Sequence, residues 1–263
     1  MRPYLAFLGA RFRVLLQYRA AAAAGLGTQL FWGLIRLMIF DAFYRSTTLP
    51  QPMTFEQVVT YVWLGQACFA LLPINIEPDV RELVRSGNVA YELLRPIDLY
   101  GLWYSRSLAM RLAPTVLRAV PLAILAALFF GLGPPASAAA GVAALLALLV
   151  SLLLAASITT LLSITLLWTL AGDGITRLGL AAVYLFSGLI VPLPLFPDWM
   201  RTFFALMPFR GLADAPFRVY MGHIPLSELG AVFFHQAVWL GLLVAAGRAL
   251  MRRGLRRLVV QGG

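Results

Sequence analysis

The chain has 263 residues, of which 61% are hydrophobic and only 12% are charged. Its 21 basic residues outnumber its 11 acidic residues and give a formal net charge of +10 at pH 7. In a soluble protein this charge would suggest a nucleic-acid partner. The apolar composition instead indicates a membrane protein, in which basic residues mark the topology and contact anionic lipid headgroups. We therefore expect membrane lipids, and no nucleic acid, as partners of the charged surface.

The residue types that are absent exclude several kinds of catalytic and metal-binding site. All basic residues are arginine, so no phosphate-binding loop of the GxxxxGK[ST] kind exists, and any ATP has to be hydrolysed by another chain. The two histidines, His223 and His235, have no cysteine or carboxylate at metal-ligand spacing. We expect no catalytic residue, no metal site and no cofactor in this chain. The single cysteine, Cys68, is predicted to be a small core residue.

The N-terminal residues 1–19 place apolar side chains at helical spacing, among them Tyr4, Phe7 and Phe12, with Arg11 between them. This pattern predicts an amphipathic helix that lies at the inner membrane surface and leads into the first span. The alternative is an ordinary basic flank without a helix.

Six long apolar stretches follow, each near or above the roughly 20 residues that a bilayer-spanning helix needs. They cover residues 20–44, 58–74, 113–132, 138–167, 178–195 and 231–249. The chain is therefore predicted to be an all-α membrane protein with six transmembrane helices.

The arginines lie mostly on alternate connections between these stretches. Fifteen fall on the N-terminal flank and on every second connection after it: Arg2, Arg11, Arg13, Arg19, Arg81, Arg85, Arg95, Arg106, Arg111, Arg177, Arg248, Arg252, Arg253, Arg256 and Arg257. Four fall on the other connections: Arg45, Arg201, Arg210 and Arg218. Because arginine-rich short loops stay in the cytoplasm during insertion, this bias predicts that both termini are cytoplasmic.

Two arginines lie inside the predicted spans. Arg118 is close to the cytoplasmic end of its span, where its long side chain can extend to the interface. Arg36 lies in the outer half of the first span, near Asp41 and potentially Glu56. We predict either an ion pair or a pathway-lining role for Arg36, because an isolated charge in the bilayer is costly.

The hydroxyl residues of the fourth span are predicted to pack against other helices: Ser151, Ser157, Thr159, Thr160, Ser163 and Thr165.

Residues 77–87, after the second stretch, predict one short helix just below the membrane. Pro78 suits the first helical turn, and Gly87 is placed to end the helix. Asp79 lies near the positive end of the helix and Arg85 near its negative end. All these local signals agree on the same helix.

The faces of this short helix differ in character. Val80 and Leu83 lie on an apolar face together with Val84, whereas Arg81 and Glu82 point elsewhere with Arg85. A charged, capped helix at this place is suited to docking a soluble motor. We therefore predict that Asp79, Arg81, Glu82, Arg85 and Gly87 couple the membrane domain to an ATPase. The alternative is a solvated helix without a partner.

Three prolines, Pro192, Pro194 and Pro197, break the chain near the outer end of the fifth stretch. Their lost hydrogen bonds need protein or water to compensate, so residues 192–225 are predicted to form a partly buried re-entrant hairpin between the fifth and sixth helices. Bulky apolar residues there are predicted to form an outer gate: Phe196, Trp199, Met207 and Phe209. Alternatively, the aromatic residues only anchor the hairpin at the membrane interface.

Two runs of residues resemble a known family. The run VRSGNVAYELLRPIDLY, residues 84–100, resembles the stretch after the second helix of ABC-2 type permease subunits, especially in the branch that includes the viologen exporters. The run SGLIVPLPLFPDWM, residues 187–200, resembles the segment with which such permeases dip back into the outer leaflet.

This resemblance implies a single transmembrane permease domain over residues 1–263, located in the bacterial cytoplasmic (inner) membrane. It also implies two permease chains, identical or from a paired gene, and separate ABC ATPase subunits that hold ATP and Mg. The expected function is export of an amphipathic or organic substrate by alternating access. The alternatives are a passive channel or assembly scaffold and, with less support, a membrane-embedded enzyme of lipid metabolism.

Overall fold

A computed structural model describes residues 2–169 and 173–256 of the chain. Residues 1, 170–172 and 257–263, which include Arg257, lie outside the described part. The described residues form helices and connections without strands. The α-helices are α1 (Arg2–Leu15), α2 (Arg19–Ser46), α3 (Phe55–Ala67), α4 (Pro78–Arg85), α5 (Val89–Leu93), α6 (Leu99–Phe129), α7 (Ala138–Thr169), α8 (Asp173–Phe186), α9 (Asp198–Leu206), α10 (Asp214–Tyr220) and α11 (Leu229–Leu255). Four short 3-10 turns are η1 (Phe69–Leu71), η2 (Leu193–Leu195), η3 (Pro208–Gly211) and η4 (Leu226–Glu228).

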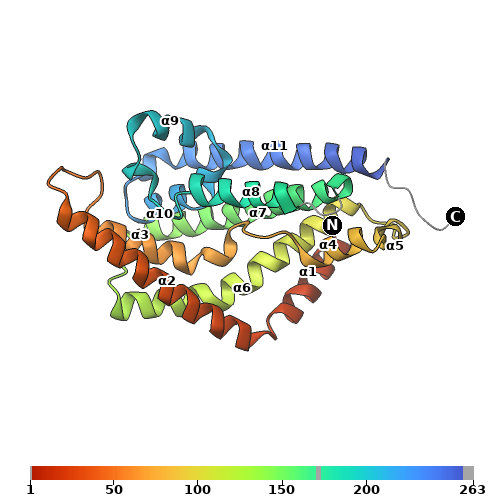
Figure 1. The fold of residues 1–263 in the computed structure, drawn as a ribbon, viewed down its shortest axis with the longest axis horizontal. Coiled ribbons are helices and arrows are strands. Elements are labelled where there is room, and N and C mark those ends of the chain that lie inside the picture. Colours follow the sequence, from red (N-terminus) through yellow and green to blue (C-terminus); the bar gives the residue numbers. More distant parts are fainter. Residues whose placement is uncertain (1, 170–172, 257–263) are drawn as a thin grey trace.

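The long helices run between two ends of an elongated bundle (Figure 1). α7 lies at its centre and packs against α6, α10 and α11, whereas α2 packs against α3 and α6. One end carries α4, α5, the start of α1 and the end of α11, and the other carries α9, α10 and the α2–α3 connection. We call these the inner end and the outer end.

Four of the described helices are long and apolar enough to cross a membrane: α2, α6, α7 and the helix over residues 226–255 that contains α11. The chain is therefore a multi-pass membrane protein. The two remaining stretches differ from the expectation of long regular spans. α3 has 13 residues and α8 has 14, both below the roughly 20 that a regular bilayer-spanning helix needs.

The second apolar stretch stops being helical at Ala67, half-way along its expected length. Cys68 leaves the helical conformation, η1 follows, and the chain then continues without regular structure to α4. The guanidinium of Arg111 in α6 compensates for the missing helical hydrogen bonds, because it donates to the carbonyl oxygens of Leu72 (2.6 Å) and Asn75 (2.5 Å). The break therefore lies inside the bundle, where side chains satisfy its backbone.

The third helix begins earlier than expected. α6 starts at Leu99, because the Asp98 carboxylate caps it by accepting a hydrogen bond from the Gly101 amide (2.8 Å). Arg106 and Arg111, expected on a cytoplasmic connection, are thus helical, and both are buried. They hold the bundle together instead of facing solvent.

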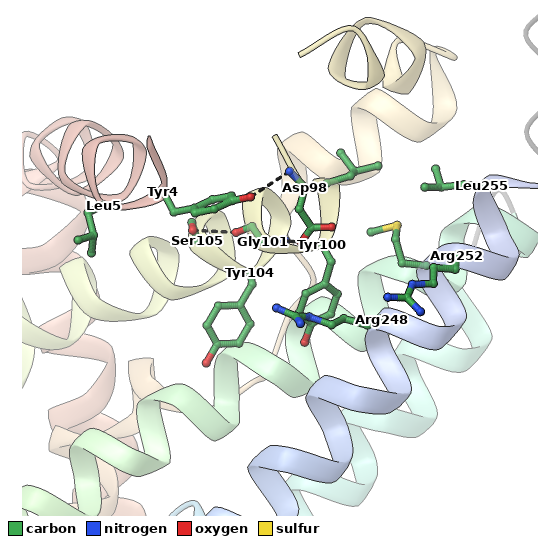
Figure 2. Close-up of a pocket in the computed structure, with 12 residues that line it drawn as sticks. Tyr4, Leu5, Asp98, Tyr100, Gly101, Tyr104, Ser105, Arg248, Arg252 and Leu255 are labelled. Carbon is green, nitrogen blue, oxygen red and sulfur yellow. Dashed lines mark hydrogen bonds between the residues drawn. The ribbon is translucent and has the colours of Figure 1, made fainter. Parts of the chain in front are cut away.

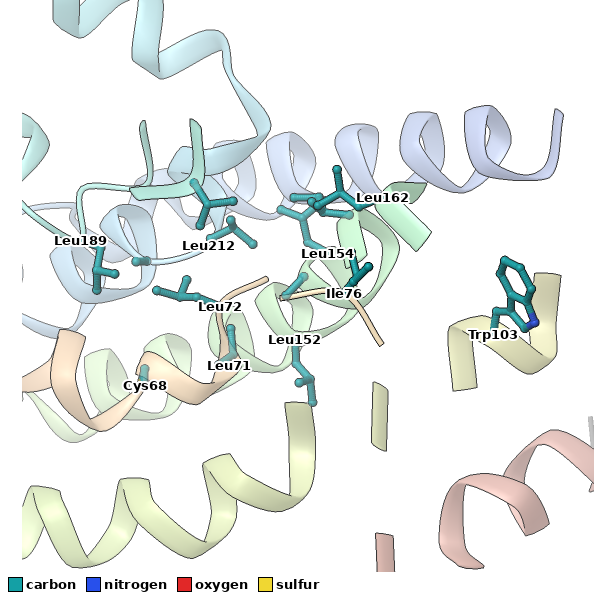
Figure 3. Close-up of a cluster of buried hydrophobic side chains, with 14 of the residues drawn as sticks. Cys68, Leu71, Leu72, Ile76, Trp103, Leu152, Leu154, Leu162, Leu189 and Leu212 are labelled. Atoms are coloured by element: carbon teal, nitrogen blue, oxygen red, sulfur yellow. The ribbon is translucent and has the colours of Figure 1, made fainter. Parts of the chain in front are cut away.

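The core joins α7 to the two broken segments. Figure 3 shows Leu152, Leu154 and Leu162 of α7 in the same cluster as leucines that follow α3 and α8. Cys68 belongs to this cluster and is buried as predicted.

Of the six hydroxyl residues of α7 that were predicted to pack against other helices, Ser151, Thr159 and Thr160 contact other elements, as predicted. Ser157, Ser163 and Thr165 instead donate hydrogen bonds to carbonyl oxygens of α7 itself. Ser151 Oγ donates to the Gly211 carbonyl (2.7 Å), and Thr160 Oγ1 donates to Ser107 Oγ (3.1 Å). Gln236 of α11 joins the first of these contacts, because its Nε2 also donates to the Gly211 carbonyl (2.9 Å).

Candidate functional site

The short helix predicted over residues 77–87 is present as α4. Glu77 caps its start, because its side chain accepts a hydrogen bond from the Val80 amide (2.8 Å), and Pro78 occupies the first turn. Its end is followed by Gly87 with a φ of 74°, a conformation that favours glycine. The sequence rules therefore located this helix correctly.

The two faces of α4 are as the sequence predicted, except that Arg81 is only partly exposed. Val80 and Val84 are buried, and Leu83 packs partly against the core. Glu82 and Arg85 are exposed. The apolar face fastens the helix to the bundle and leaves these two charges on the surface of the inner end.

The N-terminal helix α1 holds α4 in place, a contact that the sequence did not predict. Arg11 of α1 forms ion pairs with Glu77 (3.3 Å) and with Asp79. Asp79 is therefore engaged inside the chain, whereas Glu82 and Arg85 are exposed. Burial raises the pKa of the Glu77 carboxyl and the nearby Asp79 adds to this, whereas the hydrogen bond from Val80 and the charge of Arg11 oppose it.

A second ion pair connects α5 to α6 beside α1. The Glu92 carboxylate lies 2.5 Å from the Arg106 guanidinium and accepts a hydrogen bond from the Trp103 indole (2.9 Å). The same guanidinium lies 5.4 Å from the centre of the Phe7 ring of α1. The elements α1, α4, α5 and α6 are thus linked by buried charges at the inner end, and spacing along the sequence could not reveal these partners.

At the outer end, Arg36 does not form the expected ion pair. Asp41 pairs with Arg45 instead (2.8 Å), and Arg36 Nη1 donates to the Leu189 carbonyl (2.8 Å) in the irregular segment after α8. The Leu189 carbonyl is available because α8 has ended at Phe186. The position of Arg36 is therefore set by the break in the fifth stretch.

Arg36 lines an apolar pocket of about 360 Å³ between α2 and the segment after α8. Its other lining residues are Ile39, Phe40, Phe43, Ile190, Val191 and Leu195. One cation in an otherwise apolar pocket suits an amphipathic ligand.

Three of the four predicted gate residues divide into two groups, and the fourth, Met207, is half-buried between α9 and η3. Phe196 packs on Phe204 (5.0 Å between ring centres), and Phe186 of α8 connects Phe204 (5.4 Å) to Phe209 (5.9 Å). Trp199 is 76% exposed on α9 and lies outside this cluster. The structure thus brings Phe196 and Phe209 together through two further phenylalanines, Phe204 and Phe186. Phe186 could not be identified as part of this cluster from the sequence, because it belonged to a predicted span.

Residues 192–225 are more elaborate than a simple hairpin. They contain α9, α10 and two 3-10 turns, and most of α10 is buried against α7. Asp214 of α10 is completely buried and accepts a hydrogen bond from the Tyr61 hydroxyl of α3 (3.2 Å). Arg218 lies 3.6 Å and Arg210 3.9 Å from the same carboxylate. These two arginines, expected on an outer connection, thus offset the charge of the buried carboxylate that bonds α10 to α3.

The described residues contain no group of three or more metal-ligating side chains. A family model described as ABC-2 family transporter protein matches residues 30–262 of the chain. None of the curated proteins compared with the chain matches it.

Proposed function

The chain belongs to the ABC-2 transporter family, and from this membership we propose that it exports an amphipathic or organic molecule from the cytoplasm. As a family member it is a membrane permease component of an ABC transporter and works with an ABC ATPase subunit. ATP and Mg bind to that partner. We place the chain in the branch that includes the viologen exporters, on the strength of residues 84–100.

One observation carries this proposal. The family match covers residues 30–262 and thereby includes most of α2 and all of the chain from α3 to α11. The match therefore includes both the long apolar helices and α4, the helix that we propose as the docking site and that a passive channel would not need.

The proposed topology has six crossings with both termini in the cytoplasm of a bacterial cell. In this topology α3 with the segment up to α4 makes the second crossing, and α8 with the segment after it makes the fifth. The back-and-forth course of the chain in Figure 1 and the arginine bias both support this topology. Residues 192–225 would then enter the outer leaflet, and α1 would lie at the inner membrane surface.

In the proposed mechanism the ATPase contacts α4 through Glu82 and Arg85, with Arg81 beside them. Gly87 ends the helix at the surface of the inner end. Closure of the ATPase dimer on ATP moves α4 and, through the Arg11 contacts, also α1. These movements shift the interface between two permease chains, identical or paired, from inward-open to outward-open.

The outer part of the proposed pathway includes the pocket beside Arg36 and the phenylalanine cluster. The cluster can close a path to water without using charge. Replacing Phe196 and Met207 by Ala should change transport or cause leak while leaving expression and ATPase binding normal. Unchanged export by a well-expressed double variant would instead make these residues structural, with the exposed Trp199 as an interface anchor.

Co-purification with the co-encoded ATPase tests the function as a whole. We expect a stable complex whose ATPase activity responds to substrates, and absence of a complex would favour a passive channel or scaffold. The triple variant Arg81→Glu/Glu82→Arg/Arg85→Glu should lose the complex or its stimulated hydrolysis.

The matched control for this test is Arg95→Glu, which lowers the net charge by the same two units at another exposed site of the inner end. If the control loses the complex to the same extent, the docking site does not lie on α4. A normal melting temperature is required of both variants.

A further inference from the structure

A cavity of about 610 Å³ lies at the inner end of the bundle, beside the start of α6 and the last turns of α11 (Figure 2). α6 packs against α1 and α7, whereas α11 packs mainly against α7. The cavity is lined by residues from the start of α6 and the end of α11, and Tyr4 and Leu5 of α1 border it. None of its lining residues belongs to the proposed docking helix or to the outer pocket.

The cavity has a cationic side. Arg248 and Arg252 are one turn apart on α11, and both line it. The Arg248 guanidinium lies 5.6 Å from the centre of the Tyr100 ring. Neither arginine forms an ion pair with a carboxylate among the described residues, and the one carboxylate in the lining, Asp98, is occupied as the cap of α6.

The remaining lining is largely apolar and aromatic. Leu99 and Met251 form buried parts of it, and Leu255 closes one side. Tyr100 is only 3% exposed, and its hydroxyl has no hydrogen-bond partner in the described part of the chain. The cavity therefore joins two unpaired cations to an apolar wall, at the end of a membrane helix.

We propose that this cavity binds an anionic phospholipid, with Arg248 and Arg252 contacting the headgroup phosphate and the apolar wall receiving the glycerol and upper acyl carbons. Guanidinium groups suit phosphate because they offer several donors in one plane. Basic pockets between membrane helices on the cytoplasmic side are suited to anionic headgroups. Free phosphate shares the anionic chemistry but gains nothing from the apolar wall.

Binding to this site does not require an ATPase or a transport cycle. A failure of the lipid proposal is therefore distinguishable from a failure of the proposed function. The test uses the purified, delipidated full chain in detergent, titrated with phosphatidylglycerol, phosphatidylcholine or inorganic phosphate, with bound ligand counted by native mass spectrometry.

The wild type should bind phosphatidylglycerol in preference to phosphatidylcholine and to inorganic phosphate. The variant Arg248→Gln/Arg252→Gln should bind phosphatidylglycerol about 30-fold more weakly, since each arginine near an anionic headgroup contributes about 1 kcal/mol. Arg248→Lys/Arg252→Lys keeps the charges but loses the planar donors, so its affinity should lie between those of the wild type and the glutamine variant.

The matched control is Arg253→Gln/Arg256→Gln, which removes two exposed arginines from the same part of the chain but outside the cavity. If the control and the cavity variant lose phosphatidylglycerol binding to the same extent, general surface charge explains the binding and the proposed site is wrong. Unchanged binding in the cavity variant would overturn it as well. If inorganic phosphate binds as strongly as phosphatidylglycerol, the ligand of this site is a small anion and the lipid proposal is wrong.

A second variant keeps the test valid if the double arginine variant does not fold. Leu5 is 65% exposed at the border of the cavity, so Leu5→Glu adds a negative charge there without disturbing the core. We expect it to weaken phosphatidylglycerol binding, whereas Leu94→Glu, at an 80% exposed position of the inner end, should not. Equal binding by these two variants would contradict the proposal.

Discussion

Among single residues, Asp214 connects three segments that are far apart in the sequence. Its carboxylate accepts the hydrogen bond from Tyr61 of α3 and lies within ion-pair distance of Arg218 in its own helix. Its amide donates to the Ser187 carbonyl after α8 (3.2 Å). The outer end of the bundle therefore depends on one carboxylate that no sequence motif singled out.

Asp214→Ala is expected to lower the free energy of unfolding by about 3 kcal/mol, because it leaves a buried hydroxyl and partly buried guanidinium groups without their acceptor. Thermal unfolding of the detergent-purified protein measures the change. Asp198→Ala is the control, because the Asp198 side chain is 90% exposed and pairs with Arg201 on the surface of α9. Similar losses in both variants would show that the buried contacts of Asp214 add nothing.

We predict that the stability of the folded chain depends on pH through the Glu77 carboxyl. Its folded-state pKa lies above the ordinary value of 4.5, mainly because the carboxyl is buried, so the folded state binds the proton more tightly than the unfolded state. This contribution to stability is complete below pH 4.5 and is lost as the pH rises through the folded-state pKa. Glu77→Gln keeps an acceptor for Val80 and removes the titration.

The measurement is the melting temperature of wild type and Glu77→Gln across this pH range. The variant should gain stability relative to the wild type as the pH rises above 4.5. A difference that stays constant with pH would contradict the prediction.

At the scale of elements, the contact between α1 and α4 is the main addition to the sequence-based picture. Arg11→Ala should loosen α4, because Glu77 and Asp79 lose their shared cation. Hydrogen exchange of the α4 amides is expected to become faster, and stimulation of the partner ATPase should fall. Arg13→Ala, an exposed position on the same helix, should leave both unchanged. If exchange of α4 is the same in both variants, α1 does not stabilise α4.

The sequence predicted the bounds of a helix well where local residues determine them. It predicted them less well where residues distant in the sequence determine them. Pro78 and Gly87 fixed the bounds of α4, because turn and cap chemistry is local. The early end of α3 at Ala67 was missed, because apolar composition continues to Ile74 while Arg111, contributed by another helix, satisfies the unwound backbone. The ion pair predicted for Arg36 was wrong for a related reason, since the break after α8 supplies its acceptor.

For the whole molecule, the arginine bias predicts the orientation in the membrane. In a Cys68→Ala background, cysteines at Thr48 and Ser227 should react with impermeant reagents added outside intact cells, whereas cysteines at Ser86 and Asn88 should not. All four positions are exposed in the structure, so local burial does not decide the result. If the cysteine of Ser86→Cys is labelled from outside in sealed cells, the orientation is the opposite of the one predicted.

The unwound segment between α3 and α4 has a mechanical consequence. The segment contains η1 and a few short-range backbone hydrogen bonds, but no regular helix joins η1 to α4. Such a segment can behave as a tether that transmits tension to the points where it is fastened. Arg111 fastens this tether at the carbonyl oxygens of Leu72 and Asn75, and its guanidinium also donates to Thr159 of α7 (2.9 Å). α4 also packs directly against α7. A displacement of α4 can therefore reach α7 by this packing, and α6 and α7 together through the Arg111 side chain.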